Sequence, residues 1–227
     1  KQAIKTVKSS LMKNYKKNFK ILKKNHVYSE EMEHDACGVG LIASTEGKKS
    51  RKVVEYGIEA LKAVWHRGAV DADGKTGDGA GIHVEIPKDF FIEKIEVTGH
   101  TYDSSEICVG MIFLPRNDYA AQESCKTIVE SELTKNDFSI YGWRQVPVNP
   151  KVLGEKAFHT MPEIIQVLFK SNSSELLNKE LERKIYETRR KIENKAFQIS
   201  LNNFYICSLS SKSIIYKGMF LAEAISD

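Results

Sequence analysis

No stretch of the 227 residues is apolar over the roughly 18 positions that a membrane helix requires, so the sequence predicts no segment that crosses a bilayer. Cysteine is also scarce. Cys37, Cys108, Cys125 and Cys207 are widely spaced and form no C-x-x-C pair. This spacing argues against a disulfide framework and against a zinc site, and it indicates free thiols in a reducing compartment. We therefore expect a cytoplasmic protein.

Acidic residues are missing from the beginning of the chain. None precedes Glu30, whereas lysines are frequent before it. The formal net charge of +4 therefore comes from this one segment, and the remainder is slightly acidic. A local excess of this kind does not predict that the whole protein binds nucleic acid.

The basic segment has the pattern of an amphipathic helix from residue 1 to about residue 26. Its apolar residues recur every three or four positions, at Ile4, Val7, Leu11, Tyr15, Phe19 and Leu22. A loosely packed solvated helix, a targeting or membrane-surface segment and a removable propeptide all fit this pattern. A secretory signal is disfavoured because it needs a long apolar run. We favour a basic, propeptide-like leader over residues 1–36.

The remainder, residues 37–227, has the pattern of a mixed α and β domain. Predicted strands cover residues 37–43, 80–86, 106–114, 138–148 and 163–169, and a hairpin joins 203–209 to 213–217. Predicted helices cover residues 50–66, capped by Ser50, residues 118–135, capped by Asp118, and residues 175–197. Paired strands interspersed with helices favour stacked sheets covered by helices over a single parallel sheet.

Cys37 is a candidate nucleophile that needs a base, because the free thiol has a pKa of about 8.5. In an extended segment the side chains of His34 and Cys37 point to opposite faces, so the segment does not favour His34 as the base. Cleavage of the Ala36–Cys37 bond would instead free an α-amino group that can act as the base, directly or through a water. A buried core cysteine is the competing interpretation of Cys37 taken by itself.

Three motifs surround this cysteine: C-G-V-G-L-I-A from Cys37, V-W-H-R-G-A from Val64 and A-D-G-K-T-G-D-G-A-G from Ala72. The H-R-G element resembles class II glutamine amidotransferases in general. Residues 35–91 as a whole, and residues 204–218 further on, closely resemble the glutaminase domain of the glutamate synthase large chain.

The resemblance implies an α+β fold, the four-layer αββα sandwich of N-terminal-nucleophile hydrolases, here incomplete at its C-terminus. It also implies that Cys37 attacks the side-chain amide of glutamine and releases ammonia, leaving a γ-glutamyl thioester that water hydrolyses. Arg67 and Gly68 would support the nucleophile. The competing interpretation is structural: the two residues mark the end of a helix, which the glycine terminates, and have no role in catalysis.

For the full-length family, the resemblance implies that ammonia travels to an FMN site for reductive amination of 2-oxoglutarate to glutamate, with an iron–sulfur cluster supplying electrons. Within this chain we expect no cofactor and no metal. The expected partners are glutamine and either the remaining glutamate synthase regions or the small subunit. No nucleic acid or membrane partner is expected.

The loop that begins at Ala72 is not a phosphate-binding P-loop. Gly68 lies one position too far upstream for G-x-x-x-x-G-K-T, and the segment follows a helix instead of a strand. We expect a shaped connection beside the active site.

Two motifs of the family are not found in this sequence. The family takes its oxyanion donors from an Asn-Gly pair and holds the substrate carboxylate with the arginine of an R-F-S-T-N-T segment. We therefore expect a partial domain over residues 37–227 that is inactive alone, which leaves open whether this chain is by itself an enzyme. The competing hypothesis is a non-enzymatic remnant or interaction module that binds anionic partners through its lysine-rich head.

Overall fold

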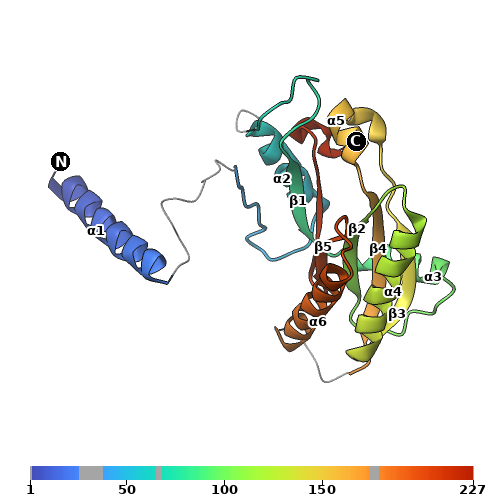
Figure 1. Cartoon of the computed structure of the whole chain (residues 1–227). Coiled ribbons are helices and arrows are strands. Elements are labelled where there is room, and N and C mark those ends of the chain that lie inside the picture. Colours follow the sequence, from blue (N-terminus) through green and yellow to red (C-terminus); the bar gives the residue numbers. More distant parts are fainter. Residues whose placement is uncertain (1, 26–37, 65–67, 174–178, 227) are drawn as a thin grey trace. The chain divides into compact units, whose positions relative to one another are not determined.

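The computed structural model describes residues 2–25, 38–64, 68–173 and 179–226 (Figure 1). The chain divides into two compact units, Lys1–Cys37 and Gly38–Asp227, which we describe separately. None of the helices in these ranges is both long and apolar enough to cross a membrane.

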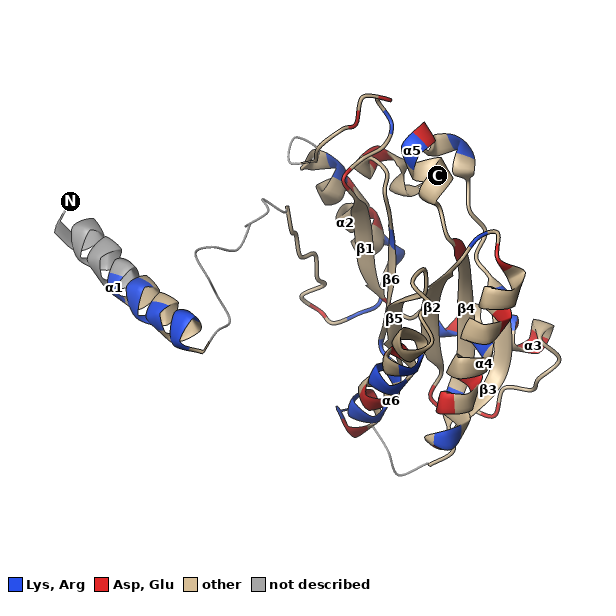
Figure 2. Cartoon of the chain, viewed as in Figure 1, with Lys and Arg blue, Asp and Glu red and all other residues tan. Residues whose placement is uncertain are grey.

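The described residues of the first unit form one helix, α1 (Gln2–Lys24), as the apolar periodicity predicts. The rings of Tyr15 and Phe19 stack one turn apart with their centroids 5.9 Å from each other, and the Lys23 ammonium lies 5.2 Å from the Phe19 centroid. Figure 2 shows lysines around the described half of this helix, and Tyr15, Ile21 and Leu22 are exposed.

The described residues of the second unit form two antiparallel sheets with helices between their strands. Its helices are α2 (Arg51–Ala63), α3 (Lys88–Val97), α4 (Tyr119–Lys135), α5 (Glu155–Thr160) and α6 (Lys179–Gln198), with short 3-10 turns η2 (Pro150–Val152) and η3 (Ala222–Ser226). Its strands are β1 (Ala80–Glu85), β2 (Cys108–Leu114), β3 (Phe138–Gln145), β4 (Glu163–Ser171), β5 (Tyr205–Ser210) and β6 (Ser213–Gly218).

The larger sheet has the strand order β3-β4-β2-β5, and the smaller one pairs β1 with β6. In the larger sheet Gly110 lies opposite both Val167 and Leu209, and in the smaller sheet Ile82 lies opposite Tyr216. Every ladder is antiparallel. The prediction of more than one sheet, in place of a single parallel sheet, is confirmed.

Two apolar cores lie on the two faces of the larger sheet. On one face α4 and α6 pack on the sheet, where Val129 of α4 and Ile192 of α6 join Phe169 of β4 in one cluster. On the other face Phe91 and Ile95 of α3 join buried residues of β2, β4 and β6, which we call the second core. Strand β6 contacts β2 and β5, and α2 contacts β1 (Figure 2). The small sheet therefore lies between α2 and the large sheet.

The predicted hairpin of residues 203–217 is wrong. Strands β5 and β6 follow each other but belong to different sheets, because β5 pairs with β2 while β6 pairs with β1. The Ile215 amide donates to the Ser208 hydroxyl across 3.2 Å, a side-chain contact where a hairpin would have a backbone ladder. The turn between them thus carries the chain from one sheet to the other.

The predicted strand of residues 37–43 is also wrong over its described part. Residues 38–43 have no regular structure, and Val39 and Leu41 are 93% and 89% exposed. A strand needs a partner for its backbone N–H and C=O groups. No described strand pairs with this segment. Its apolar sequence alone is therefore insufficient to make it a strand.

The other predicted elements are found with shifted ends, and two helices were not predicted. Ser50 caps α2 by accepting from the Lys52 amide at 3.2 Å, and Asp118 caps α4 by accepting from the Ala121 amide at 2.9 Å. Helices α3 and α5 are short, with 10 and 6 residues, and neither has a side-chain hydrogen bond at its N-cap. Both helices therefore lack the N-capping side chain from which the beginning of a helix is predicted.

Candidate active site

The predicted nucleophile lies outside the described residues. Cys37 is one of these residues, and so are Arg67 and its neighbours Trp65 and His66. Gly68, in contrast, is described and exposed. Gly68 begins the loop 68–79, which leads directly into β1. This loop is the part of the predicted site that the structure describes.

The loop closes on itself through its backbone. Val70 and Gly77 form an isolated antiparallel bridge, and inside it the Asp71 amide donates to the Thr76 carbonyl at 2.9 Å. At the tip the Gly74 amide donates to the Asp71 carbonyl at 3.0 Å. Gly74 has a φ of +71°, a left-handed conformation that glycine adopts without steric cost.

The Asp73 carboxylate accepts hydrogen bonds from donor groups inside this loop. It accepts from the Lys75 amide at 2.9 Å, from the Thr76 amide at 2.7 Å and from the Thr76 hydroxyl at 2.5 Å. The Thr76 hydroxyl, followed by these amides, holds the pKa of Asp73 well below its ordinary value. The amides of the G-K-T sequence are thus used within the loop, which agrees with our rejection of a P-loop.

Helix α5 clasps the loop from one side. Thr76 is only 2% exposed, and its hydroxyl also accepts from the Ala157 amide at 3.3 Å. Gly154 precedes α5, and a Cβ there would lie 2.2 Å from Asp73 Oδ2 and 2.3 Å from Thr76 Oγ1. Only glycine allows this close approach. The loop and the start of α5 therefore form one packed unit.

Replacing Thr76 with valine is expected to loosen this unit. Valine keeps the branched shape but removes the hydroxyl, so the Ala157 amide and the Asp73 carboxylate lose a partner. An unsatisfied buried donor costs about 1–3 kcal/mol. Denaturant unfolding should show T76V destabilised by that amount and the matched variant T134V, at an exposed helical threonine with no side-chain hydrogen bond, unchanged. Equal effects of the two variants would contradict the clasp.

A surface ion pair adds to the clasp. The Lys156 ammonium lies 2.7 Å from Asp71 Oδ2. This hydrogen bond lowers the pKa of Asp71 and raises the pKa of Lys156. Both side chains are at least one third exposed, so water screens the pair and its contribution to stability is small.

The two depressed carboxyl pKa values predict how the loop responds to acid. A carboxyl whose pKa is lower in the folded than in the unfolded state stabilises the fold above the unfolded value, and that stability is lost as the pH falls through the folded value. The hydrogen bonds of these carboxylates should therefore contribute their full stability at neutral pH and lose it progressively as the pH falls below about 4 toward the lowered folded values. In a carbon-detected NMR titration we expect the Asp73 carboxyl to titrate far below 3.8 and the Thr76 amide to shift with it. A midpoint at the ordinary aspartate value would contradict the hydrogen-bond arrangement.

The C-terminal part of the chain packs on the other side of the loop. A Cβ at Gly77 would lie 2.6 Å from the carbonyl oxygen of Phe220, so that segment leaves no space for a side chain. Next to it, β1 and β6 are joined by their ladder and by a 2.7 Å hydrogen bond between His83 Nε2 and the Ser213 hydroxyl. The loop is thus held between α5 and the residues that follow β6.

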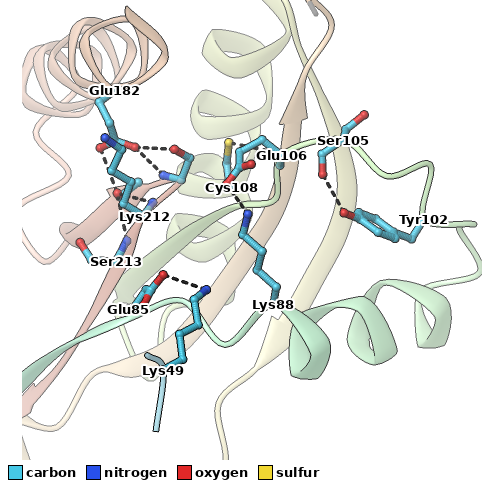
Figure 3. A network of polar contacts seen from close by, with 12 residues as sticks. Lys49, Glu85, Lys88, Tyr102, Ser105, Glu106, Cys108, Glu182, Lys212 and Ser213 are labelled. Atoms are coloured by element: carbon cyan, nitrogen blue, oxygen red, sulfur yellow. Dashed lines mark hydrogen bonds and ion pairs between the residues drawn. The ribbon is translucent and has the colours of Figure 1, made fainter. Parts of the chain in front are cut away.

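A second polar cluster fixes the turn between β5 and β6. Figure 3 shows Glu182 reaching from α6 toward this turn. Its carboxylate accepts from the Ser211 amide at 2.7 Å and from the hydroxyls of Ser211 and Ser210 at 2.7 and 2.9 Å. The Ser210 hydroxyl in turn accepts from the Lys212 amide at 2.9 Å. Four hydrogen bonds thus shape the turn that sends β6 into the small sheet beside loop 68–79.

The three described thiols are buried, and their surroundings disfavour the thiolate. Burial raises the pKa of Cys125 to about 11 and also raises the pKa values of Cys108 and Cys207. A thiol in such an environment is a poor nucleophile at neutral pH. Within the described part of the chain, no three His, Cys, Asp or Glu side chains lie close enough to hold a metal ion.

Comparison with known proteins identifies the family. A model of the class-II glutamine amidotransferases matches residues 37–227. The chain belongs to the class-II glutamine amidotransferases. The predicted likeness to this family is thereby confirmed, and the mixed α and β structure with antiparallel sheets is the fold of one of its members.

The similar sequences are glutamate synthases. The chain is 53% identical over 94% of its length to the large chain of an NADPH glutamate synthase from Azospirillum brasilense. It is 40% identical over 85% of its length to ferredoxin-dependent glutamate synthase 1 of Arabidopsis thaliana, and 37% over 85% to the ferredoxin-dependent enzyme of Spinacia oleracea. It spans only 14%, 12% and 12% of these three proteins. The predicted resemblance to a glutamate synthase glutaminase domain is confirmed.

Some residues of this site were not predicted from the sequence. Asp73 and Thr76 form a local pattern, an aspartate whose side chain bonds the amides two and three residues later, which the sequence offers as a signal. Gly154 and Lys156 lie about eighty positions away, and nothing local indicates that they contact the loop.

Proposed function

We propose that this chain is the glutaminase part of a glutamate synthase, with Cys37 as the nucleophile that cleaves glutamine. The observation that carries the proposal is that the family match begins at residue 37. The described thiols support it as well, since all three are buried and have raised pKa values. Cys37 is the one remaining cysteine of the sequence.

The proposed reaction begins once residues 1–36, the leader, have been removed. The free α-amino group of Cys37 accepts the thiol proton, directly or through a water, and the sulfur bonds to the side-chain amide carbon of glutamine. The carbon–nitrogen bond then breaks, and the nitrogen takes a proton and leaves as ammonia. Water attacks the γ-glutamyl thioester, the carbon–sulfur bond breaks, and glutamate and the thiol are released.

Arg67 and Gly68 have a supporting part in this proposal. They connect α2 to loop 68–79, and the clasp by α5 and the residues after β6 holds that loop in place. The packing of α2, the small sheet, the large sheet and the α4–α6 pair supports a four-layer αββα sandwich. We propose that residues 38–43 add a strand to it in the working enzyme.

We propose that reductive amination depends on polypeptide outside residues 37–227. The resemblance assigns the FMN and the iron–sulfur cluster to those regions, and it assigns to them the oxyanion donors, which are worth about 3 to 4 kcal/mol in such reactions. By itself the chain should therefore turn over glutamine very slowly. Its proposed partners are glutamine, those further regions and the small subunit, in the cytoplasm.

A hybrid enzyme tests this proposal. Residues 37–227 would replace the corresponding residues of the Azospirillum brasilense large chain, to which the chain is 53% identical. We expect the hybrid, combined with that organism's small subunit, to make glutamate from 2-oxoglutarate with glutamine as nitrogen donor. Activity with ammonia but none with glutamine, in a correctly processed hybrid, would refute the glutaminase assignment.

A further inference from the structure

A cluster of two cationic side chains, one amide and one aromatic ring lies on the second-core face of the large sheet, away from loop 68–79. It consists of Arg144 on β3, Gln166 on β4, and Phe90 and Lys94 on α3. Arg144 and Gln166 are direct partners in the β3–β4 ladder, and α3 packs against β3. The mechanism proposed above uses none of these residues.

Gln166 is fully buried and only half satisfied. Its Oε1 accepts from Arg144 Nη1 at 2.8 Å, whereas Nε2 is the one buried side-chain nitrogen or oxygen without a partner among the described residues. A buried donor without a partner costs about 1–3 kcal/mol, so its presence in the fold calls for a physical reason. The bond from Arg144 fixes the amide, with its oxygen toward the guanidinium and its two N–H groups free.

Arg144 also lacks an acidic partner. It is half-buried, its guanidinium carbon lies 5.1 Å from the centroid of the Phe90 ring, and it forms no ion pair with any described carboxylate. Lys94 lies 5.0 Å from the same centroid and likewise has no carboxylate partner in the described part of the chain. Two cations therefore lie near one aromatic ring, and no described carboxylate forms an ion pair with either of them.

We propose that this cluster binds a small carboxylate, held by the Arg144 guanidinium and neutralising Arg144 and Lys94 together. A guanidinium offers a planar set of N–H groups that matches a carboxylate, and here only one of its five is in use. Gln166 and Phe90 hold the guanidinium plane in place, one through a hydrogen bond and the other by stacking. The N–H groups of Gln166 are fully buried, so Gln166 positions the guanidinium and does not itself contact the ligand.

Acetate titration of the full chain tests this site. The readouts are the NMR signals of arginine Nε–H and of glutamine side-chain NH2 groups, assigned by the variants themselves, with sodium chloride at equal ionic strength as reference. We expect saturable shifts of the Arg144 and Gln166 signals with acetate and none with chloride. R144Q should weaken acetate binding at least about tenfold, equivalent to about 1.4 kcal/mol.

Two further variants make the test specific. Arg116 also stacks on a phenylalanine, with its guanidinium carbon 4.8 Å from the Phe158 centroid, but its guanidinium donates to the Phe158 carbonyl and not to a glutamine side chain, so R116Q should leave acetate binding unchanged. Q166E places a carboxylate next to Arg144, and this variant should fold and no longer respond to acetate. Equal responses to acetate and chloride, no response at all, or equal losses in R144Q and R116Q would each overturn the proposal.

Discussion

Alanine in place of Cys37 should reduce glutamine-dependent glutamate formation by the hybrid enzyme at least about 10³-fold, the scale of loss when a covalent nucleophile is removed. The sulfur forms the thioester, and alanine has no atom that can replace it. Ammonia supplied directly bypasses this step, so ammonia-dependent formation should remain unchanged. Both rates are measured on the same preparation by following glutamate.

The matched control is Cys125→Ala. This variant removes a buried thiol of raised pKa, and it should leave both rates unchanged. A loss of both rates in C37A would mean that the substitution disturbs the fold, and C37S would then separate the two effects because it preserves size. Retention of the glutamine-dependent rate in C37A would contradict the assignment of the nucleophile.

Valine in place of Gly110 should cause the largest loss of stability. Gly110 is buried at the centre of β2, and a Cβ there would lie 2.6 Å from Leu209 Cδ1 and 2.6 Å from Val167 Cγ1. These side chains belong to the core under α4 and α6 and have little room to move. Overpacking of this kind costs about 1–3 kcal/mol, and the branched side chain should reach or exceed the upper end.

Denaturant unfolding of G110A, G110V and G40A tests this steric argument. The destabilisation should increase from G110A to G110V, because the second variant adds two methyl groups to the same clash. G40A should have no effect, since no atom lies within 4 Å of the position of its Cβ. Equal stability of G110V and the unsubstituted chain would show that the contact between β2, β4 and β5 is looser than described.

Much of the fold was predictable because local patterns determine it. The strand that begins at Ala80 and the caps of α2 and α4 depend on a few neighbouring residues, and each is found as predicted. Pairing between strands was not predictable in the same way. Strands β5 and β6 look like a hairpin in sequence, but the contacts of Glu182 with their connecting turn come from α6, which no local pattern reveals.

The segment 38–43 illustrates the same limit. Its sequence is apolar and typical of a strand, yet a strand forms only where another strand supplies hydrogen bonds. Residues next to it in the chain carry no information about that partner. The exposure of Val39 and Leu41 therefore does not contradict the apolar pattern, and it shows which part of the prediction depended on long-range pairing.

For the candidate site, motifs identified the loop, and geometry identified how it is held. The A-D-G-K-T-G-D-G sequence indicated a shaped connection, and Asp73 with Thr76 provides that shape. The contribution of Gly154 depends on contacts between segments distant in sequence. Its signal is a single glycine before a helix of 6 residues, which does not by itself indicate a contact with the loop.

Site-specific labelling tests the central claim most directly. A chain that begins at Cys37 and the chain of residues 1–227 would each be treated with an electrophilic glutamine analogue and then analysed by intact mass and peptide mapping. We expect the shorter chain to gain one label, located on Cys37, and the longer chain to react far more slowly because its residue 37 has no free α-amino group. Labelling of another cysteine, or equal labelling of Cys37 in both chains, would contradict a nucleophile that works as the first residue of the chain.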